Sequence, residues 1–298
     1  MTGSNSLAGR AVLITGGTSG IGLHTAAALG QMGATVYVTG RDDARGRDAE
    51  RRLRELAGRE CVRFIKADAS TVGGNQWLAR RLHELTDRLH VLVNNVGGLF
   101  NDRLTSADGY ELTLAMNFVG PVALTQALLP LLQQSAPARI VNIVSSAHAM
   151  WSGDPFADLH AETSYLGLRV HARAKLFNLL WTLALARRVE GSDIVVNATN
   201  PGMAWTTTTK GLARRAMPTA QRFFWPLFRL IQRTGSAERA ARAPIFLASS
   251  PEAAAFSGAY LESNARPAQL SAEALDRGRQ DRALELGNSL VASALTAR

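Results

Sequence analysis

The segment AVLITGGTSGIG, residues 11–22, constrains the fold of this chain more than any other stretch. An apolar run breaks there into a glycine-rich turn, and the helical pattern LHTAAALGQMG follows. Gly16, Gly20 and Gly22 carry no Cβ, so the backbone can turn tightly and approach a phosphate, and the N–H groups of the following helix face that anion. The segment therefore predicts a strand, loop and helix that bind a dinucleotide pyrophosphate, with a plain tight turn as the alternative.

Strand-like and helix-like stretches alternate along the chain with short connections. After the first strand, the expected strands are 34–39, 62–67, 90–94, 139–145, 193–199 and a short one at 259–261. The expected helices include 44–57, 74–89, 109–134, 236–249 and a polar amphipathic helix within a C-terminal extension of about residues 270–298. This alternation predicts an α/β fold with a doubly wound parallel sheet of about seven strands and helices on both faces. Its ligand site is expected beyond the carboxyl ends of the strands.

One domain over residues 1–298 is expected, because no long Pro/Gly/Ser linker divides the chain. Residues 1–8 lack the apolar core of a signal peptide, and no run approaches the roughly 20 apolar residues of a membrane span. We therefore expect a soluble cytoplasmic protein without stable membrane insertion. The single cysteine, Cys61, excludes an internal disulfide and offers no metal cluster, so no metal is expected.

The formal net charge of +9 does not indicate nucleic-acid binding. Basic residues are interleaved with acids, as in DDARGRDAERRLRELAGRE, which is typical of a solvated helical face. No compact basic block or RNA-binding motif accompanies the charge. Lysine is rare, with Lys66, Lys175 and Lys210 only, so a lysine at a motif position carries information.

The end of the second expected strand indicates which nicotinamide cofactor binds. An NAD site commonly has an acid about 20 residues past the glycines, but here the chain reads Gly40-Arg41. An arginine offers its planar fork to a 2′-phosphate, which favours NADP(H) over NAD(H). Because Asp42 and Asp43 follow, an ordinary surface arginine is the alternative. Asp68, at the end of the third strand, could accept a hydrogen bond from an adenine amino group.

Three motifs in order, TGGTSGIG, NNVG and NPG, resemble those of the short-chain dehydrogenase/reductase family over nearly the whole chain. The insert between Ser145 and Lys175 and the run KLFNLLWTLALARRVEGSDIVVNATNPG are similar to its retinol-dehydrogenase-like branch. The resemblance implies a single-domain Rossmann fold, a nicotinamide cofactor and a homo-oligomer, either dimer or tetramer. The cofactor contacts expected from the motifs are Thr15, Gly16, Thr18, Ser19, Gly20, Ile21, Gly22, Arg41, Asp68, Asn94, Val96, Gly97, Lys175, Pro201, Gly202 and Thr206.

The same resemblance implies the catalytic residues. Asn117 matches the asparagine that holds a proton-relay water, and Ser145 matches the serine that hydrogen-bonds the substrate oxygen, with Ser146 as an alternative. Lys175 matches the lysine of the family. Tracing four residues back from it places His171 where the family has a tyrosine.

His171 and Lys175 share a helix face because they are four residues apart. A nearby ammonium would push an imidazole toward its neutral form, which can act as a base or a hydrogen-bond donor. Tyr165 is the alternative acid, but it lies six residues before His171 with Gly167 between them, so it would face another direction or act from a loop. A second alternative is that His171 fills a space where activity has been lost.

The resemblance also assigns residues of about 203–235 to the segment that covers the substrate. Aromatic residues there and in the insert predict an apolar, ring-containing substrate, or else a lid that packs on its own body or at an oligomer interface; they are Trp205, Phe223, Phe224, Trp225, Phe228 and Trp151. Three hypotheses follow. The first is an NADP(H)-dependent carbonyl reductase or alcohol dehydrogenase with an atypical Ser-His-Lys site. The others are an enzyme of a non-redox step such as cyclisation, dehydration or isomerisation, in natural-product biosynthesis, and a non-catalytic cofactor-binding relative.

Overall fold

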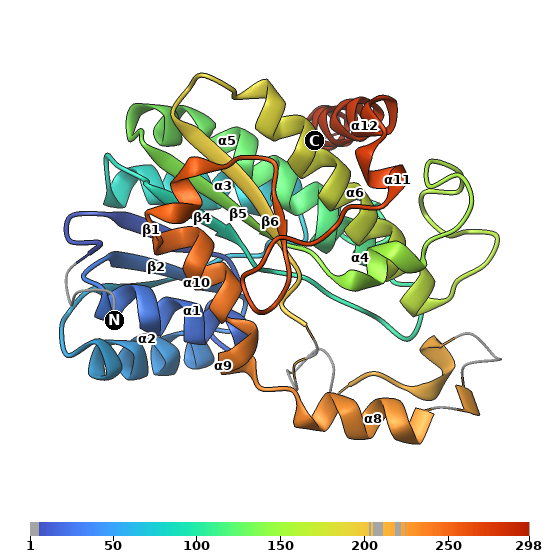
Figure 1. Cartoon of the computed structure of the whole chain (residues 1–298), viewed down its shortest axis with the longest axis horizontal. Helices are drawn as coiled ribbons and strands as arrows, with labels where there is room; N and C mark the ends of the chain where they lie inside the picture. The colour runs from blue at the N-terminus through green and yellow to red at the C-terminus, as the bar shows by residue number, and fades with distance from the viewer. Residues whose placement is uncertain (1–5, 203, 205–210, 218–221, 224, 298) are drawn as a thin grey trace.

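Seven parallel strands form one sheet in the order β3-β2-β1-β4-β5-β6-β7 (Figure 1). The computed structural model describes residues 6–202, 204, 211–217, 222–223 and 225–297, without the side chains of Phe228 and Ile231. The strands are β1 (Ala11–Ile14), β2 (Thr35–Gly40), β3 (Val62–Lys66), β4 (Val91–Asn94), β5 (Ala138–Ile143), β6 (Ile194–Thr199) and β7 (Tyr260–Leu261). The predicted doubly wound parallel sheet is confirmed.

Helices and helical turns connect the strands. They are α1 (Gly20–Gln31), α2 (Asp43–Ala57), α3 (Val72–Leu85), α4 (Leu112–Leu114), the π-helical turn η1 (Ala115–Val119), α5 (Gly120–Gln134), η2 (Ser146–Met150), α6 (Gly167–Arg188), η3 (Arg214–Ala216), α8 (Trp225–Thr234), α9 (Ala237–Ala240), α10 (Arg242–Ser249), η5 (Glu252–Ala255), α11 (Ala272–Leu275) and α12 (Arg277–Thr296).

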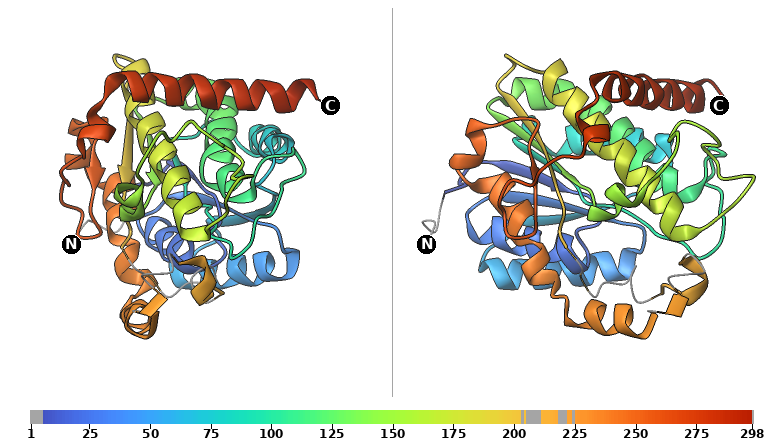
Figure 2. Two further views of the ribbon diagram at one scale, coloured as in Figure 1. Left: turned by 90° about the vertical axis from the view of Figure 1, so that its right-hand side faces the viewer. Right: turned by 45° about the vertical axis from the view of Figure 1, so that its right-hand side comes forward.

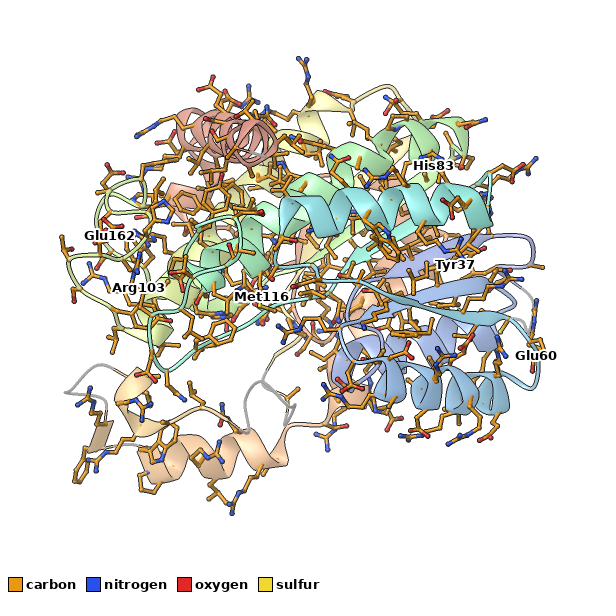
Figure 3. All side chains as sticks on the ribbon, turned by 180° about the vertical axis from the view of Figure 1, so that it is seen from behind. Tyr37, Glu60, His83, Arg103, Met116 and Glu162 are labelled. Atoms are coloured by element: carbon orange, nitrogen blue, oxygen red, sulfur yellow. The ribbon has the colours of Figure 1, made fainter. Side chains whose placement is uncertain are left out.

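Successive strand residues point to opposite faces of the sheet, and each face buries its own apolar layer. Val12 and Ile14 on β1 belong to a cluster with residues of α1, α2 and α10. Leu13 between them belongs to the other cluster, which α3, α5, α6 and α12 share. Tyr37 on β2 also faces α3, and its hydroxyl donates to the Leu85 carbonyl at 3.3 Å (Figure 3). Both faces of the sheet are therefore buried, as the near-continuous apolar strands require.

The order of the strands reverses beside β1, because β2 and β3 lie on one side of it and β4 follows on the other. Connections therefore diverge above the carboxyl ends of β1 and β4, where α/β sheets place their ligand sites. Helix α12 contacts α3, α5 and α6, which cover one face of the sheet, and it runs along the outside of the molecule (Figure 2). The chain thus opens a crevice at the predicted edge of the sheet.

Several of the expected helices differ in their bounds from those predicted. Helix α3 begins at Val72, where the Thr71 side chain accepts from Gly74 N, and it ends at Leu85 because Thr86 is extended. The expected 236–249 helix divides at Ala241 into α9 and α10. Pro244 has no N–H to continue the hydrogen-bond ladder, which accounts for a break one turn before it.

The expected 109–134 helix begins at Leu112. The Glu111 carboxylate caps its start by accepting from Thr113 N and Leu114 N, both at 2.8 Å. Within the described residues, the stretch Leu112–Gln134 is long and apolar enough to cross a membrane, but 78% of its most apolar window is buried inside the protein. The core of this fold therefore accounts for its apolar character.

Candidate active site

A cavity of about 370 Å³ lies at the carboxyl ends of the strands, between the glycine-rich loop and α6. Most of the predicted site residues line it; these are Gly16, Thr18, Ser19, Gly20, Ile21, Arg41, Asp68, Val96, Gly97, Asn117, Ser145, His171, Lys175, Pro201 and Gly202. Residues from distant parts of the sequence therefore meet in one place.

Three predicted cofactor contacts lie behind this wall. Thr15 is buried, and its hydroxyl accepts from the backbone N–H groups of Asn95 and Val96, both at 3.0 Å. Asn94 points into the core, where it donates to Asn142 Oδ1 at 2.9 Å. A Cβ on Gly22 would approach Asn95 Nδ2 to 2.6 Å. These residues hold the loops in place. Thr206, another predicted cofactor contact, lies outside the described residues.

Asn95 lines the cavity, although the sequence analysis singled out its neighbour Asn94. Its side-chain Nδ2 donates to the Thr15 carbonyl at 2.8 Å and thereby ties the loop after β4 to the glycine-rich loop. Asn94 is the last residue of β4 and Asn95 lies beyond it, so their side chains project differently. The sequence does not show at which residue β4 ends, and that position decides which of the two asparagines faces the cavity.

The glycine-rich loop has the conformation that a phosphate cradle needs. Gly16 and Gly20 have φ of +65° and +55°, which residues with a Cβ rarely adopt. Ser19 precedes α1 in an extended conformation and makes no side-chain capping hydrogen bond, and the first turn of α1 contains no acid. The first N–H groups of the helix therefore face the cavity without an internal anion, so the loop fits a pyrophosphate.

The part of the cavity wall at the end of β2, next to the glycine-rich loop, is basic. Arg41, Asp42 and Arg45 line it beyond the end of β2. The Asp42 carboxylate accepts from Arg45 N at 2.9 Å, which caps α2, and lies 3.5 Å from the Arg45 guanidinium. Asp42 is therefore engaged with the helix, while Arg41 extends the cationic wall. Asp68 is also on this wall, with its Oδ1 accepting from Ser70 N and Oγ.

His171 and Lys175 project from α6 into the same cavity. The Lys175 Nζ donates to the Ile143 carbonyl at 2.7 Å, and the His171 Nδ1 lies 3.0 Å from the Gly98 carbonyl. A Cβ placed on Gly97 would be 2.7 Å from Asn117 Oδ1 and 3.3 Å from Lys175 Nζ, so both groups crowd the backbone there. Only a glycine leaves the wall open between them.

The hydrogen bond to Gly98 determines the tautomer of His171. A carbonyl oxygen only accepts, so Nδ1 carries the proton and Nε2 keeps its lone pair. Burial, and secondarily the Lys175 ammonium, lower the pKa of His171 to about 4. Burial also lowers the pKa of Lys175 to about 7. At neutral pH, His171 is therefore an uncharged imidazole whose Nε2 is a proton acceptor.

Asn117 lies in the π-helical turn η1, which the sequence analysis did not predict. Its Nδ2 donates to the carbonyls of Gly98 and Thr113, both at 2.8 Å, and Asn178 Nδ2 donates to its carbonyl at 2.7 Å. Such a widened turn leaves a backbone carbonyl open to side-chain donors and recurs at functional sites. Met116, in the same turn, also lines the cavity and lies near the centre of the view in Figure 3.

The alternative residues for the catalytic serine and for the acid lie at different places relative to the cavity. Ser145 lines the cavity, with its hydroxyl accepting from Ala147 N at 3.2 Å, whereas Ser146 is exposed and off the wall. Tyr165 lies in the loop before α6, off the cavity wall, and its hydroxyl donates to the Phe100 carbonyl at 3.3 Å. Burial raises the pKa of Tyr165. His148 supports Ser145, because its Nδ1 lies 2.7 Å from the Ser145 carbonyl.

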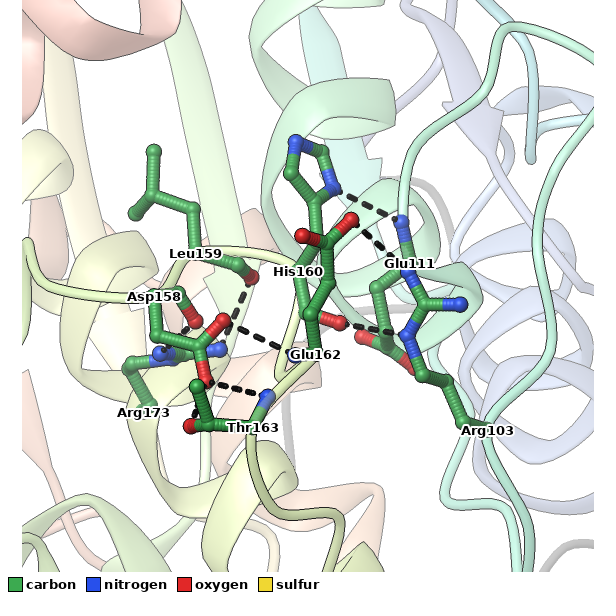
Figure 4. Close-up of polar contacts among 8 residues, drawn as sticks. All are labelled: Arg103, Glu111, Asp158, Leu159, His160, Glu162, Thr163 and Arg173. Carbon is green, nitrogen blue, oxygen red and sulfur yellow. Dashed lines mark hydrogen bonds and ion pairs between the residues drawn. The ribbon is translucent and has the colours of Figure 1, made fainter.

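The insert that precedes α6 is held by arginines (Figure 4). Arg173 donates to the carbonyls of Ala157, Asp158 and Leu159 at 2.7 to 2.9 Å, and Arg103 donates to the His160 carbonyl at 2.8 Å. This set of contacts fixes the insert against α6 and the loop that follows β4.

Trp151 does not line the cofactor cavity. The guanidinium groups of Arg169 and Arg173 lie 5.1 and 5.3 Å from the centre of its ring, beside a separate cavity. Arg169 and Arg173 of α6 thus cover this ring, and a contact of Trp151 with the substrate stays a prediction.

The segment expected to cover the substrate is anchored beside the site. Asn101 Nδ2 donates to the Gly211 carbonyl, and Ala213 N donates to Asn101 Oδ1. Arg215 pairs with both oxygens of Asp102. Trp205 and Phe224 lie outside the described residues, as does the side chain of Phe228.

The fold and the cavity together define a Rossmann-type dinucleotide-binding protein. A family model described as short chain dehydrogenase matches residues 10–216. The chain belongs to the short-chain dehydrogenase/reductase family, an oxidoreductase family, and is an enzyme of its retinol-dehydrogenase-like branch.

Three relatives illustrate the likeness. Polyprenol dehydrogenase of Mus musculus is 33% identical over 264 residues, covering 86% of this chain and 76% of that protein. Retinol dehydrogenase 14 of Homo sapiens is 35% identical over 269 residues, covering 85% and 77%. The solved Pseudomonas aeruginosa RhlG/NADP active-site complex superposes with a TM-score of 0.69 at 32% identity, covering 89% of this chain and 98% of that chain. Both the family and the conformation of the glycine-rich loop therefore agree with a nicotinamide cofactor.

Proposed function

We propose that the chain is an NADP(H)-dependent oxidoreductase that interconverts an apolar alcohol and its carbonyl compound. The observation that carries this proposal is the common cavity wall of Ser145, His171 and Lys175 beside a glycine cradle for a pyrophosphate. Asn117 adds an amide next to the lysine. When bound, a nicotinamide cofactor supplies hydride exchange, and the residues of this chain handle the proton.

The preference for NADP(H) rests on the cationic end of the cavity. Arg41 and Arg45 line it, and the neighbouring Asp42 caps α2 instead of reaching toward a ribose. A guanidinium fork suits a phosphate, whereas the NAD pattern needs a free carboxylate. The solved relative that carries NADP in its description supports the same choice.

The tautomer of His171 provides a proton acceptor for the alcohol. With Nδ1–H committed to the Gly98 carbonyl, Nε2 can accept the proton of an alcohol while the Ser145 hydroxyl orients the substrate oxygen. In carbonyl reduction the same imidazole would donate the proton, and its lowered pKa of about 4 keeps it mostly uncharged at pH 7. The uncharged histidine is thus already prepared to act as the base.

An apolar substrate is supported by the covering segment and by the relatives. The covering segment contains Phe223, an exposed aromatic residue. Two of the relatives are named for alcohols, a polyprenol and retinol. We infer that the substrate of this chain is also an apolar alcohol. That the chain forms a homo-oligomer is likewise a proposal.

A non-redox reaction is the second candidate. A buried neutral histidine whose Nδ1 is hydrogen-bonded to the Gly98 carbonyl keeps its lone pair on Nε2 and can act as a general base in its own right. Cyclisation, dehydration or isomerisation could use that base without net hydride transfer.

One experiment separates the two. Purified protein is first titrated with NADPH and NADP⁺, and is then incubated with apolar alcohols and ketones while absorbance at the NADPH band and product mass are followed together. The proposal predicts NADPH formation in step with carbonyl product. Turnover with no absorbance change would favour the non-redox reaction, and tight binding without any turnover would contradict both.

A further inference from the structure

Another cavity lies at the amino ends of the strands, at the edge of the sheet opposite the cofactor cavity; we call it the amino-edge cavity. Its volume is about 670 Å³, within the range of about 300–1,000 Å³ that small-molecule sites occupy. The lining residues come from three connections: 8–10 before β1, 87–90 before β4, and 134–137 between α5 and β5. Among the described residues none lines both cavities, so this one is separate from the proposed reaction.

Two arginines of the amino-edge cavity are open to a ligand. In the part of the chain that the structure describes, the Arg88 side chain makes no hydrogen bond and no ion pair. The Arg10 side chain makes a single hydrogen bond there, from Nη1 to the Pro137 carbonyl at the long distance of 3.4 Å. A planar guanidinium fork binds the oxygens of a phosphate in pairs. Two such forks on one wall are therefore suited to an oxyanion.

These arginines are not needed to cap α5, which ends beside the cavity. Cations near the end of a helix often donate to its last carbonyls. Here the carbonyls of Leu131 and Leu132 accept from Ser135 N, and that of Gln133 accepts from Ala136 N. The backbone therefore satisfies the helix end, and both guanidinium groups remain available on the wall.

His90 adds a donor in a fixed tautomer. Its side chain is 7% exposed, and its Nδ1 accepts from Ala11 N at 3.0 Å, so the proton of the neutral ring is on Nε2. Burial, and secondarily the charges of Arg10 and Arg88, lower the pKa of His90, which leaves the ring uncharged at neutral pH. Nε2–H has no partner among the described residues and is accessible to solvent. The cavity thus has a neutral N–H donor beside its two cations.

The wall carries a positive excess. Asp87 is the one acid among its described residues, and it forms no ion pair with any other described residue. Two guanidinium groups and one carboxylate leave one positive charge, because His90 is uncharged. An anionic ligand would neutralise this charge.

We propose that the amino-edge cavity binds a small phosphate monoester, whose phosphate is held by the guanidinium groups of Arg10 and Arg88 and by His90 Nε2–H. The volume leaves room for an organic group beside the phosphate, and Ala136 and Pro137 supply apolar wall for it. Occupation of this site does not depend on the reaction proposed for the cofactor cavity.

Calorimetric titration of the full chain with phenyl phosphate tests the proposal. We expect saturable binding with a Kd below about 1 mM, and weaker binding of inorganic phosphate, which lacks the organic group. The melting temperature should rise with the concentration of phenyl phosphate, because a ligand of the folded state stabilises it. No saturable binding up to about 10 mM, or tighter binding of inorganic phosphate, would overturn the proposal.

The glycine-rich loop also fits a phosphate, so three variants that each lose one positive charge separate the two cavities. Arg88→Gln should raise the Kd for phenyl phosphate at least about tenfold, because it removes a charge-assisted fork. Arg52→Gln on the exposed side of α2, and Arg41→Ser in the cofactor cavity, should leave this Kd within about twofold. Parent-like affinity in Arg88→Gln, or a loss of binding in Arg41→Ser, would overturn the proposal.

Two further variants test the neutral donor and the acid. His90→Asn keeps an oxygen that can accept from Ala11 N but removes Nε2–H, so the Kd for phenyl phosphate should rise about threefold to tenfold. Asp87→Asn removes a negative charge from the wall and should lower this Kd about twofold to threefold, the opposite of what general damage to the fold would do. Both variants should keep the circular dichroism of the parent. Unchanged affinity in His90→Asn, or weaker binding in Asp87→Asn, would overturn the assignment of the phosphate to this wall.

Discussion

Replacing the buried lysine should stabilise the protein while destroying its site. Lys175 is 4% exposed, and burial lowers its pKa from 10.5 to about 7. At about 1.36 kcal/mol per unit, keeping this side chain in the folded protein costs on the order of 4 kcal/mol at pH 7. Lys175→Met removes that cost and also the hydrogen bond to the Ile143 carbonyl, worth about 1 kcal/mol. The expected net gain in the free energy of unfolding is about 3 kcal/mol.

The sign of the effect depends on pH. The folded pKa is lower than the unfolded one, so the unfolded chain binds more protons between pH 7 and 10.5. The destabilisation by Lys175 is fully present below the folded pKa and disappears as the pH approaches 10.5. The advantage of Lys175→Met should therefore be largest at and below neutral pH and vanish in alkali.

Thermal and urea unfolding of the protein without cofactor, between pH 6 and about 10, measure this difference. At pH 7 the variant should melt about 5 to 10 °C higher. Lys66→Met is the matched control, because Lys66 is exposed at the end of β3 and should change stability little. A variant less stable than the parent at pH 7, or a difference independent of pH, would refute the reasoning.

Three further substitutions test the walls of the cavity. Arg41→Ser should raise the Kd for NADPH on the order of tenfold to a hundredfold and leave that for NADH within about twofold, as measured by fluorescence titration; equal losses would contradict the phosphate role. Gly97→Ala should weaken cofactor binding at least about tenfold, because its Cβ would be 2.7 Å from Asn117 Oδ1, whereas Gly30→Ala, with its nearest neighbours at 3.4 Å, should not. Tyr165→Phe should keep turnover within about twofold because Tyr165 lies off the cavity; a hundredfold loss would identify it as the acid.

Periodicity and spacing were sufficient for the parallel sheet and for the pairing of His171 with Lys175. Apolar runs of strand length define the sheet, because both of its faces are buried. A spacing of four residues defines a shared helix face, whatever the tertiary contacts. The structure also places Ser145 on the cavity wall and Ser146 off it, which the sequence left open.

Features that depend on tertiary contacts were not predictable. The π-helical turn at Asn117 rests on hydrogen bonds from its side chain to Gly98 and Thr113, which the local sequence does not specify. The cover on Trp151 comes from two arginines of α6. Likewise, the pointing of Asn94 into the core depends on where β4 ends. The cytoplasmic location and the homo-oligomer stay predictions.

The most direct test of the account is the rate of NADPH formation from NADP⁺ and apolar alcohols by the parent protein, His171→Ala and His83→Ala. His83 lies on the outer helix α3 and serves as the control. The account predicts that His171→Ala loses about 10² to 10⁴ in kcat with unchanged NADP⁺ affinity, while His83→Ala matches the parent. A parent-like rate in His171→Ala would contradict the assignment of the imidazole as the proton acceptor.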